Sequence, residues 1–171
     1  MTTPAPSVSL RPFERRHLSR TLTWTNDPEL ARLLNRARQV SPDEHDRWFI
    51  ALQDRDDTLI FAIERAADGE HVGNVWLADI DRCHHKAEVR VVIGGHDPLN
   101  RGCGSAALDL IARHAFGAMA LHRAYAYVLA FNPRAQRAFE KAGFAVEGLL
   151  RDDRLADGAY TDVIVLGRIA P

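Results

Sequence analysis

A helix with one apolar face is the first element that the pattern of polar and hydrophobic positions predicts. Ser41 is suited to cap such a helix, Pro42 fits its first position, and Glu44 completes a capping box. Bulky side chains then recur at i, i+3, i+4 and i+7, namely His45, Trp48, Phe49 and Leu52. We therefore expect a helix from Pro42 onward that buries this face against the rest of the protein.

One strand and two short helices are expected before it. Loose alternation of apolar and polar residues predicts a strand near Ser7 to Pro12. A short helix is predicted from Leu18 to Trp24, and a second one from Pro28 to Arg38 with its leucines on one face. Residues 1–7 are rich in Thr, Pro and Ala and are expected to form an N-terminal tail.

The middle of the chain predicts a sheet that is interrupted by a helix. Runs rich in Val, Ile and Leu indicate strands at Thr58 to Glu64, His71 to Ile80 and Ala87 to Ile93, and the first two are predicted to form a hairpin. After a glycine-rich loop, an apolar stripe predicts a helix from Ser105 to about Met119. A further strand is predicted from Ala124 to Phe131.

The last part of the chain predicts a capped helix followed by a hairpin. Asn132 is a typical helix N-cap, and Gly143 is a typical residue for the end of the same helix. Asp157-Gly158 lies between two strand-like runs, Leu149 to Arg154 and Tyr160 to Ile169, and is a strong hairpin signal. The order of elements predicts an α+β fold with a mostly antiparallel sheet.

Composition narrows the class of protein. A chain of 171 residues is long enough for one ordinary domain, which we place at residues 8–171. The formal net charge is −1, so the basic excess of a general nucleic-acid binder is missing. No apolar run is long enough to span a membrane, and the N-terminus does not resemble a signal peptide. We expect a soluble, cytoplasmic protein that binds neither nucleic acid nor membrane.

The cysteines do not predict a disulfide framework or a metal site. The chain has two, Cys83 and Cys103, in unrelated contexts. Cys83 is followed by His84 and His85, but no second pair of ligands appears at a spacing typical of zinc sites. We interpret this segment as a polar turn between strands and expect no metal.

The glycine-rich loop is the sharpest chemical feature. Gly102-Cys103-Gly104 follows a predicted strand and leads directly into a predicted helix, an arrangement typical of a phosphate cradle. No Lys follows Gly104, so the segment is not a P-loop. A dinucleotide fingerprint belongs in the first βα unit of a parallel sheet, whereas antiparallel strands precede this loop.

A series of short motifs accompanies the loop segment Asn100 to Ala107. In chain order they are Leu10-Arg11-Pro12, Trp24 with Asn26-Asp27-Pro28, Ile93-Gly94, Leu121-His122-Arg123, Asn132-Pro133-Arg134-Ala135, Phe139 to Phe144, Glu147 to Arg151, and Asp157 to Asp162. Over residues 8–169 this series resembles the GNAT N-acetyltransferases, and within them the RimJ/RimL-type ribosomal-protein alanine acetyltransferases. The resemblance implies an acetyl-CoA-binding acetyltransferase domain whose central strands splay apart.

The resemblance also implies which residues bind acetyl-CoA. The pantetheine arm is expected along the backbone of Val91, Val92 and Ile93. The pyrophosphate is expected on the loop, at Leu99, Asn100, Arg101, Gly102, Cys103, Gly104 and Ser105. Asn132 and Phe139 are expected beside the cofactor where the next strand opens into its helix. Relatives often carry a hydroxyl at the positions of Phe139 and Ala135, so this chain lacks the family's usual general acid.

The sequence gives weaker signals for the residues that would bind or activate the amine acceptor. Glu88 is our candidate general base, directly or through water, and its alternative is a surface carboxylate. His45, Trp48 and Tyr160 are candidate acceptor-binding residues, although packing is an ordinary role for His45 and Trp48. The expected function is direct transfer of an acetyl group from acetyl-CoA to a primary amine, either a protein N-terminus or a small molecule, by a possible homodimer. A non-catalytic acyl-CoA sensor or interaction module and a nucleotide-binding protein remain alternatives.

Overall fold

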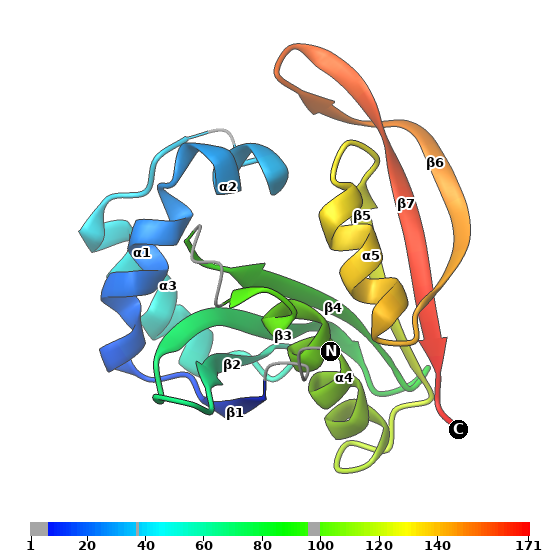
Figure 1. The fold of residues 1–171 in the computed structure, drawn as a ribbon, viewed down its shortest axis with the longest axis horizontal. Helices are drawn as coiled ribbons and strands as arrows, with labels where there is room; N and C mark the ends of the chain where they lie inside the picture. The colour runs from blue at the N-terminus through cyan, green and yellow to red at the C-terminus, as the bar shows by residue number, and fades with distance from the viewer. Residues whose placement is uncertain (1–6, 37, 96–99) are drawn as a thin grey trace, which may run out of the picture.

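The structure, a computed structural model, describes residues 7–36, 38–95 and 100–171 (Figure 1). Its elements in chain order are β1 Val8–Pro12, the 3-10 helix η1 Arg15–His17, α1 Leu18–Thr25, α2 Pro28–Leu33, α3 Pro42–Gln53, β2 Leu59–Arg65, β3 His71–Asp81, β4 Lys86–Ile93, α4 Cys103–Phe116, β5 Arg123–Leu129, α5 Pro133–Lys141, β6 Ala145–Ala156 and β7 Ala159–Ile169. This order confirms the predicted α+β class. Of the predicted tail, only Ser7 lies within the described residues.

The strands form one 7-stranded sheet in the order β1-β2-β3-β4-β5-β7-β6. Every neighbouring pair is antiparallel except β4 and β5, which run parallel. These two strands pair only from Lys86↔Arg123 to Glu88↔Tyr125 and then separate, as the diverging ribbons in Figure 1 show. The structure therefore contains the splay that the resemblance implied.

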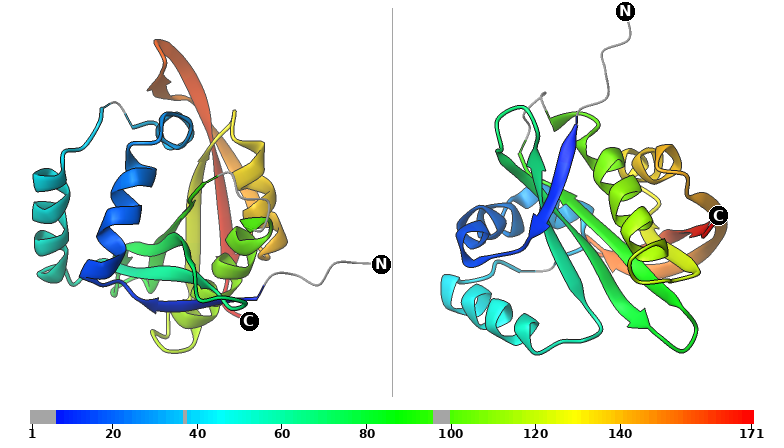
Figure 2. Two further views of the ribbon diagram at one scale, coloured as in Figure 1. Left: turned by 60° about the vertical axis from the view of Figure 1, so that its left-hand side comes forward. Right: turned by 90° about the horizontal axis from the view of Figure 1, so that it is seen from below.

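Helices cover both faces of this sheet. α1, α2 and α3 lie on one side, and α4 and α5 lie on the other (Figure 2). Leu108, Ile111 and Ala112 of α4 are fully buried against the sheet, and Ala124 and Ala126 of β5 are buried on the same side. The core therefore fills the α4 side, which leaves the opposite face of β4 and β5 open for a site.

The predicted helix caps are confirmed. Ser41 and Glu44 hydrogen-bond to each other's backbone N–H at 3.2 and 2.9 Å, as a capping box requires. At the end of α5, Gly143 has φ +83°, and the N–H of Phe144 donates to the carbonyl oxygen of Phe139 at 3.1 Å. The expected hairpin turn is also present, with φ of +51° at Asp157 and +80° at Gly158.

Three predicted boundaries or faces differ from the structure. Helix α2 ends at Leu33 rather than Arg38, because Asn35 adopts a left-handed φ of +50° and turns the chain. Strand β6 begins at Ala145 instead of Leu149, because pairing with β7 extends it although its side chains are exposed. The apolar face of α3 is only partly buried, since Trp48 remains 36% exposed.

Candidate active site

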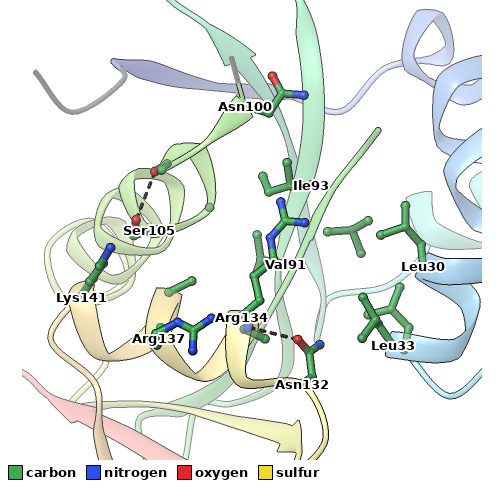
Figure 3. A pocket seen from close by; sticks show the side chains of 16 residues that line it. Leu30, Leu33, Val91, Ile93, Asn100, Ser105, Asn132, Arg134, Arg137 and Lys141 are labelled. Carbon is green, nitrogen blue, oxygen red and sulfur yellow. Dashed lines mark hydrogen bonds between the residues drawn. The ribbon is translucent and has the colours of Figure 1, made fainter. Parts of the chain in front are cut away.

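Two cavities meet where β4 and β5 separate. The first, which we call the α2–α5 cavity, has a volume of about 230 Å³ and lies between α2, β4, the start of α4 and α5 (Figure 3). The second, the α1–α3 cavity, has a volume of about 1190 Å³ and extends over the face of β3, β4 and β5 that α1 and α3 cover. Val91 and Val92 line both cavities, so the edge of β4 connects them.

The α2–α5 cavity carries positive charge. Arg134, Arg137 and Lys141 line it from α5, and no Asp or Glu is among its described lining residues (Figure 3). Such a wall attracts an anionic ligand. These three cations were missed in the sequence analysis. Their spacing of three and four residues, which places them along one side of the helix, is the signal that would have found them.

The start of α4 supplies backbone donors to the same cavity. Gly102, the N-cap, has φ +86°, a conformation that favours glycine. Cys103 is fully buried in the core, so its thiol points away from the cavity. Gly104 and Ser105 line the cavity, and the first-turn N–H groups of this 14-residue helix attract anions. The exposed Arg101 is not a lining residue, and Leu99 lies outside the described residues.

Strand β4 exposes backbone along the cavity. Val91, Val92 and Ile93 all line it, as predicted. They pair with β3 on one edge, but β5 is no longer paired with β4 beyond Glu88. Polar backbone groups on the open edge are therefore available to an extended ligand that carries amides of its own.

Asn132 and Phe139 lie where β5 leads into α5. The side-chain oxygen of Asn132 accepts a hydrogen bond from the N–H of Ala135 at 3.1 Å, and the residue lines both cavities. Asn132 therefore caps α5 and at the same time borders both cavities. Phe139 is 3% exposed and packs edge-on against Phe144, with ring centroids 5.1 Å apart. It borders the α1–α3 cavity as an apolar wall.

A buried asparagine fixes the glycine-rich loop to the sheet. The side chain of Asn100 donates to the carbonyl oxygen of Gly94 at 3.0 Å and accepts from Nη1 of Arg65 at 2.9 Å. Arg65 is also buried and is held in turn by the carboxylates of Asp68 and Glu70. This chain of contacts connects both sides of the loop to β2, 35 residues away in sequence.

We expect Asn100→Ala to raise the KM for acetyl-CoA about tenfold, because two hydrogen bonds that hold the loop are lost, one of them to a charged group. Steady-state kinetics with varied acetyl-CoA measures this. Asn26→Ala is the matched control, because Asn26 makes two similar bonds of 2.8 Å to the backbone of Val40, away from the loop. An equal rise of KM in both variants would contradict the role assigned to Asn100.

The α1–α3 cavity contains the candidate acceptor residues of α3. His45 is buried, and its ring stacks on Trp48 with centroids 5.1 Å apart. Burial, and after it the positive charge of Arg36, lower the pKa of His45, so its imidazole stays neutral over a wider pH range. Both side chains line the cavity. Tyr160 is not brought to either cavity, because it lies beside the β6–β7 turn and is 69% exposed.

Glu88 lies at the closed end of the splay. It belongs to the last β4–β5 pair, lines the α1–α3 cavity and is 8% exposed. Nη2 of Arg90 donates to Oε2 of Glu88 at 2.6 Å and also contacts Asp79 at 3.2 Å. The geometry therefore places an oriented carboxylate, with its Oε1 free of described hydrogen bonds, in the α1–α3 cavity at the closed end of the splay.

No metal centre or membrane span emerges from the described residues. Within them no group of three or more His, Cys, Asp and Glu side chains is arranged to hold a metal ion. Cys83 is exposed, and His84 contacts Asp81 at 2.7 Å in the turn between β3 and β4. In the described part of the chain, no helix is both long and apolar enough to cross a membrane.

Comparison with known proteins identifies the family. The profile described as "Acetyltransferase (GNAT) domain" matches residues 7–145. The chain is 29% identical over 167 residues to the spermidine N(1)-acetyltransferase of Escherichia coli K12, which covers 94% of this chain and 84% of that protein. It is 31% identical over 122 residues to the probable N-acetyltransferase YjcK of Bacillus subtilis, which covers 69% of this chain and 65% of that protein.

The fold is also found among solved structures. The spermidine N-acetyltransferase of Vibrio cholerae in complex with CoA and spermine superposes with a TM-score of 0.87 at 24% identity, covering 95% of each chain. A dodecameric structure of the same Vibrio cholerae enzyme matches with a TM-score of 0.77 at 23% identity, covering 95% of this chain and 93% of that one. The sequence match, the splayed sheet and the cation-lined cavity lead to one conclusion: the chain belongs to the GNAT acetyltransferase family.

Proposed function

We propose that this protein transfers the acetyl group of acetyl-CoA to a primary amine of a small molecule, and that polyamines are the first acceptor class. The observation that carries the proposal is the slot between β4 and β5. It connects the cation-lined α2–α5 cavity with the larger α1–α3 cavity, and Glu88 lines the second cavity at the closed end of the slot. The polyamine class is supported by the spermidine acetyltransferases among the relatives.

The residues of the α2–α5 cavity fit acetyl-CoA. Arg134, Arg137, Lys141 and the N-terminus of α4 suit its phosphates, and the open edge of β4 suits the amides of its pantetheine arm. The bound cofactor supplies an activated acetyl thioester. Backbone along β4 orients that group toward the α1–α3 cavity, so that the residues of the second cavity face the acceptor.

Glu88 is proposed to activate the amine. A protonated amine has no free electron pair, so the reaction needs a base that accepts a proton before or during attack. Glu88 is oriented by Arg90 and belongs to the last β4–β5 pair. From there it can reach an amine in the slot, either directly or through a water molecule. Asn132 and Phe139 close the other side of the junction, so the amine approaches from the α1–α3 cavity.

The charged side chains that line the α1–α3 cavity favour a second candidate class of acceptor. Each lining carboxylate is already in contact with an arginine: Glu44 with Arg38 at 2.9 Å, and both Asp79 and Glu88 with Arg90. Arg36 is exposed and lines the cavity without a side-chain partner among the described residues. An unpaired guanidinium suits an acceptor that carries a carboxylate or phosphate beside its amine.

Release of free CoA thiol, measured with a panel of amines, tests both classes. The panel contains spermidine, spermine, a simple aliphatic amine, small amines with a carboxylate or phosphate, and a peptide with a free N-terminal alanine. We expect turnover with the polyamines. Higher kcat/KM for an anionic amine, lost in Arg36→Gln, would favour the second class. Tight acetyl-CoA binding in calorimetry with no turnover on any amine would instead favour a non-catalytic module. The predicted homodimer stays a prediction.

A further inference from the structure

We propose that Tyr127 is the residue that protonates the departing CoA sulfur. The proposal rests on the proposed function and fills the gap left by Phe139 and Ala135, neither of which has a hydroxyl. In the reaction the amine nitrogen forms a bond to the acetyl carbon, and the bond from that carbon to sulfur breaks. The amine loses a proton to Glu88, and the sulfur, which keeps the electron pair of the broken bond, takes a proton from the Tyr127 hydroxyl.

The first argument is the placement of Tyr127 on β5. Its neighbour on the same strand face, Tyr125, belongs to the last β4–β5 pair, opposite Glu88. Tyr127 is two residues further on, about 7 Å along the strand, where β4 and β5 are no longer paired. The two rings are in edge contact with centroids 5.8 Å apart, which confirms that both lie on one face. The phenol of Tyr127 therefore belongs to the closed end of the slot.

The second argument is the surroundings of that face. Ala126 and Val128, on either side of Tyr127, point into the core and are 0% and 4% exposed. Tyr127 points the other way and lines the α1–α3 cavity together with Glu88 and Arg90. The α1–α3 cavity thus presents a carboxylate and a phenol on one face of the sheet, the pair of groups that the two proton transfers require.

The third argument comes from the other hydroxyls that line the two cavities. Thr21 donates to the carbonyl oxygen of His17 at 2.8 Å, and Thr25 donates to that of Thr21 at 2.8 Å. Ser105 donates to the carbonyl oxygen of Gly102 at 3.1 Å. Each of these three hydroxyls therefore already donates its proton to a backbone carbonyl oxygen. The hydroxyl of Tyr127 has no hydrogen-bond partner among the described residues, so its proton is available.

The proposed role requires that solvent can reach the phenol. An alkyl thiol is a somewhat stronger acid than a phenol, with ordinary pKa values of about 8.5 and about 10. Transfer is therefore completed only if the phenolate is reprotonated. Tyr127 is 46% exposed, so water in the open cavity restores its proton after each turnover.

Tyr127→Phe is the test, with Tyr125→Phe as its matched control on the same strand face. Tyr125 is not among the residues that line either cavity. With spermidine, or the panel amine of highest turnover, we expect Tyr127→Phe to lower kcat about 100-fold while the KM for acetyl-CoA stays within about twofold. Tyr125→Phe is expected to retain kcat within about twofold.

Three results would overturn the proposal. They are a kcat of Tyr127→Phe close to that of the wild type, an equal loss in both variants, and a higher KM for the amine at unchanged kcat. The last would make Tyr127 an acceptor-binding residue. Failure of the proposed function looks different, because the wild-type protein would then acetylate no amine of the panel. Thermal melting of both variants by circular dichroism controls for folding.

Discussion

Glu88→Gln is expected to lower kcat about 100- to 1000-fold and to leave the KM for acetyl-CoA within about twofold. Glutamine keeps an oxygen that accepts the hydrogen bond from Arg90, so the strand and the cofactor slot stay intact. It cannot accept a proton from the amine. The measurement is steady-state thiol release over a range of pH. Without the base, the rate should follow the fraction of amine that is already neutral and rise with pH throughout.

Asp79→Asn provides the matched control for this variant. Asp79 lines the same cavity and contacts the same Arg90 at 3.2 Å, but it lies on β3 and not at the β4–β5 junction. We expect its kcat to stay within a few fold of the wild type. If both variants lose activity equally, the charge of the cavity matters more than a base at residue 88. An unchanged pH profile in Glu88→Gln would reject Glu88 as the base.

Gly94→Ala is expected to destabilise the protein by about 3 kcal/mol. A Cβ atom at residue 94 would lie 1.9 Å from Cε2 of Trp24, and that ring is itself buried, at 9% exposure. The ring would have to move into the α1–α3 cavity, or the start of the loop would have to leave the sheet. Urea unfolding followed by intrinsic fluorescence measures the loss of stability, and calorimetry with acetyl-CoA measures the accompanying loss of cofactor affinity.

Gly148→Ala is the control for Gly94→Ala. An added Cβ at Gly148, in the exposed strand β6, would meet nothing within 4 Å. Its stability should therefore stay within about 1 kcal/mol of the wild type. A Gly94→Ala protein as stable as this control would show that Trp24 is free to shift, and that close packing of α1 on the loop does not hold the loop in place.

Local signals predicted the helices and turns well, because their causes lie within a few residues. The capping box at Ser41 and Glu44, the N-cap Asn132 and the turn at Asp157-Gly158 are all confirmed. The early end of α2 was not predictable in the same way. Leu34 still follows Leu30 at helical spacing, and the left-handed conformation of Asn35 ends the helix.

The residues of the candidate site that belong to recognisable sequence motifs were predicted. The backbone of β4, Gly104, Ser105 and Asn132 all line the α2–α5 cavity. Contacts between distant segments left no local signal, which is why the link from Asn100 to Arg65 and the packing of Trp24 on Gly94 were missed. Tyr127 was missed for a related reason, since only the extent of the strand pairing shows that it lies just beyond the last β4–β5 pair.

The short β4–β5 pairing has a consequence for how the whole chain holds together. Among the residues that the structure describes, three residue pairs are the only strand pairing between the part of the sheet formed by β1 to β4 and the part formed by β5, β7 and β6. Residues of β4 and Asn132, at the end of β5, line the same cavity, so a ligand bound there would contact both parts of the sheet. At a hundred times its Kd, such a ligand adds about 2.7 kcal/mol to the free energy of unfolding. Bound acetyl donor would thus add a removable link between two parts of the sheet that are otherwise joined by the short β4–β5 pairing and by the core under α4.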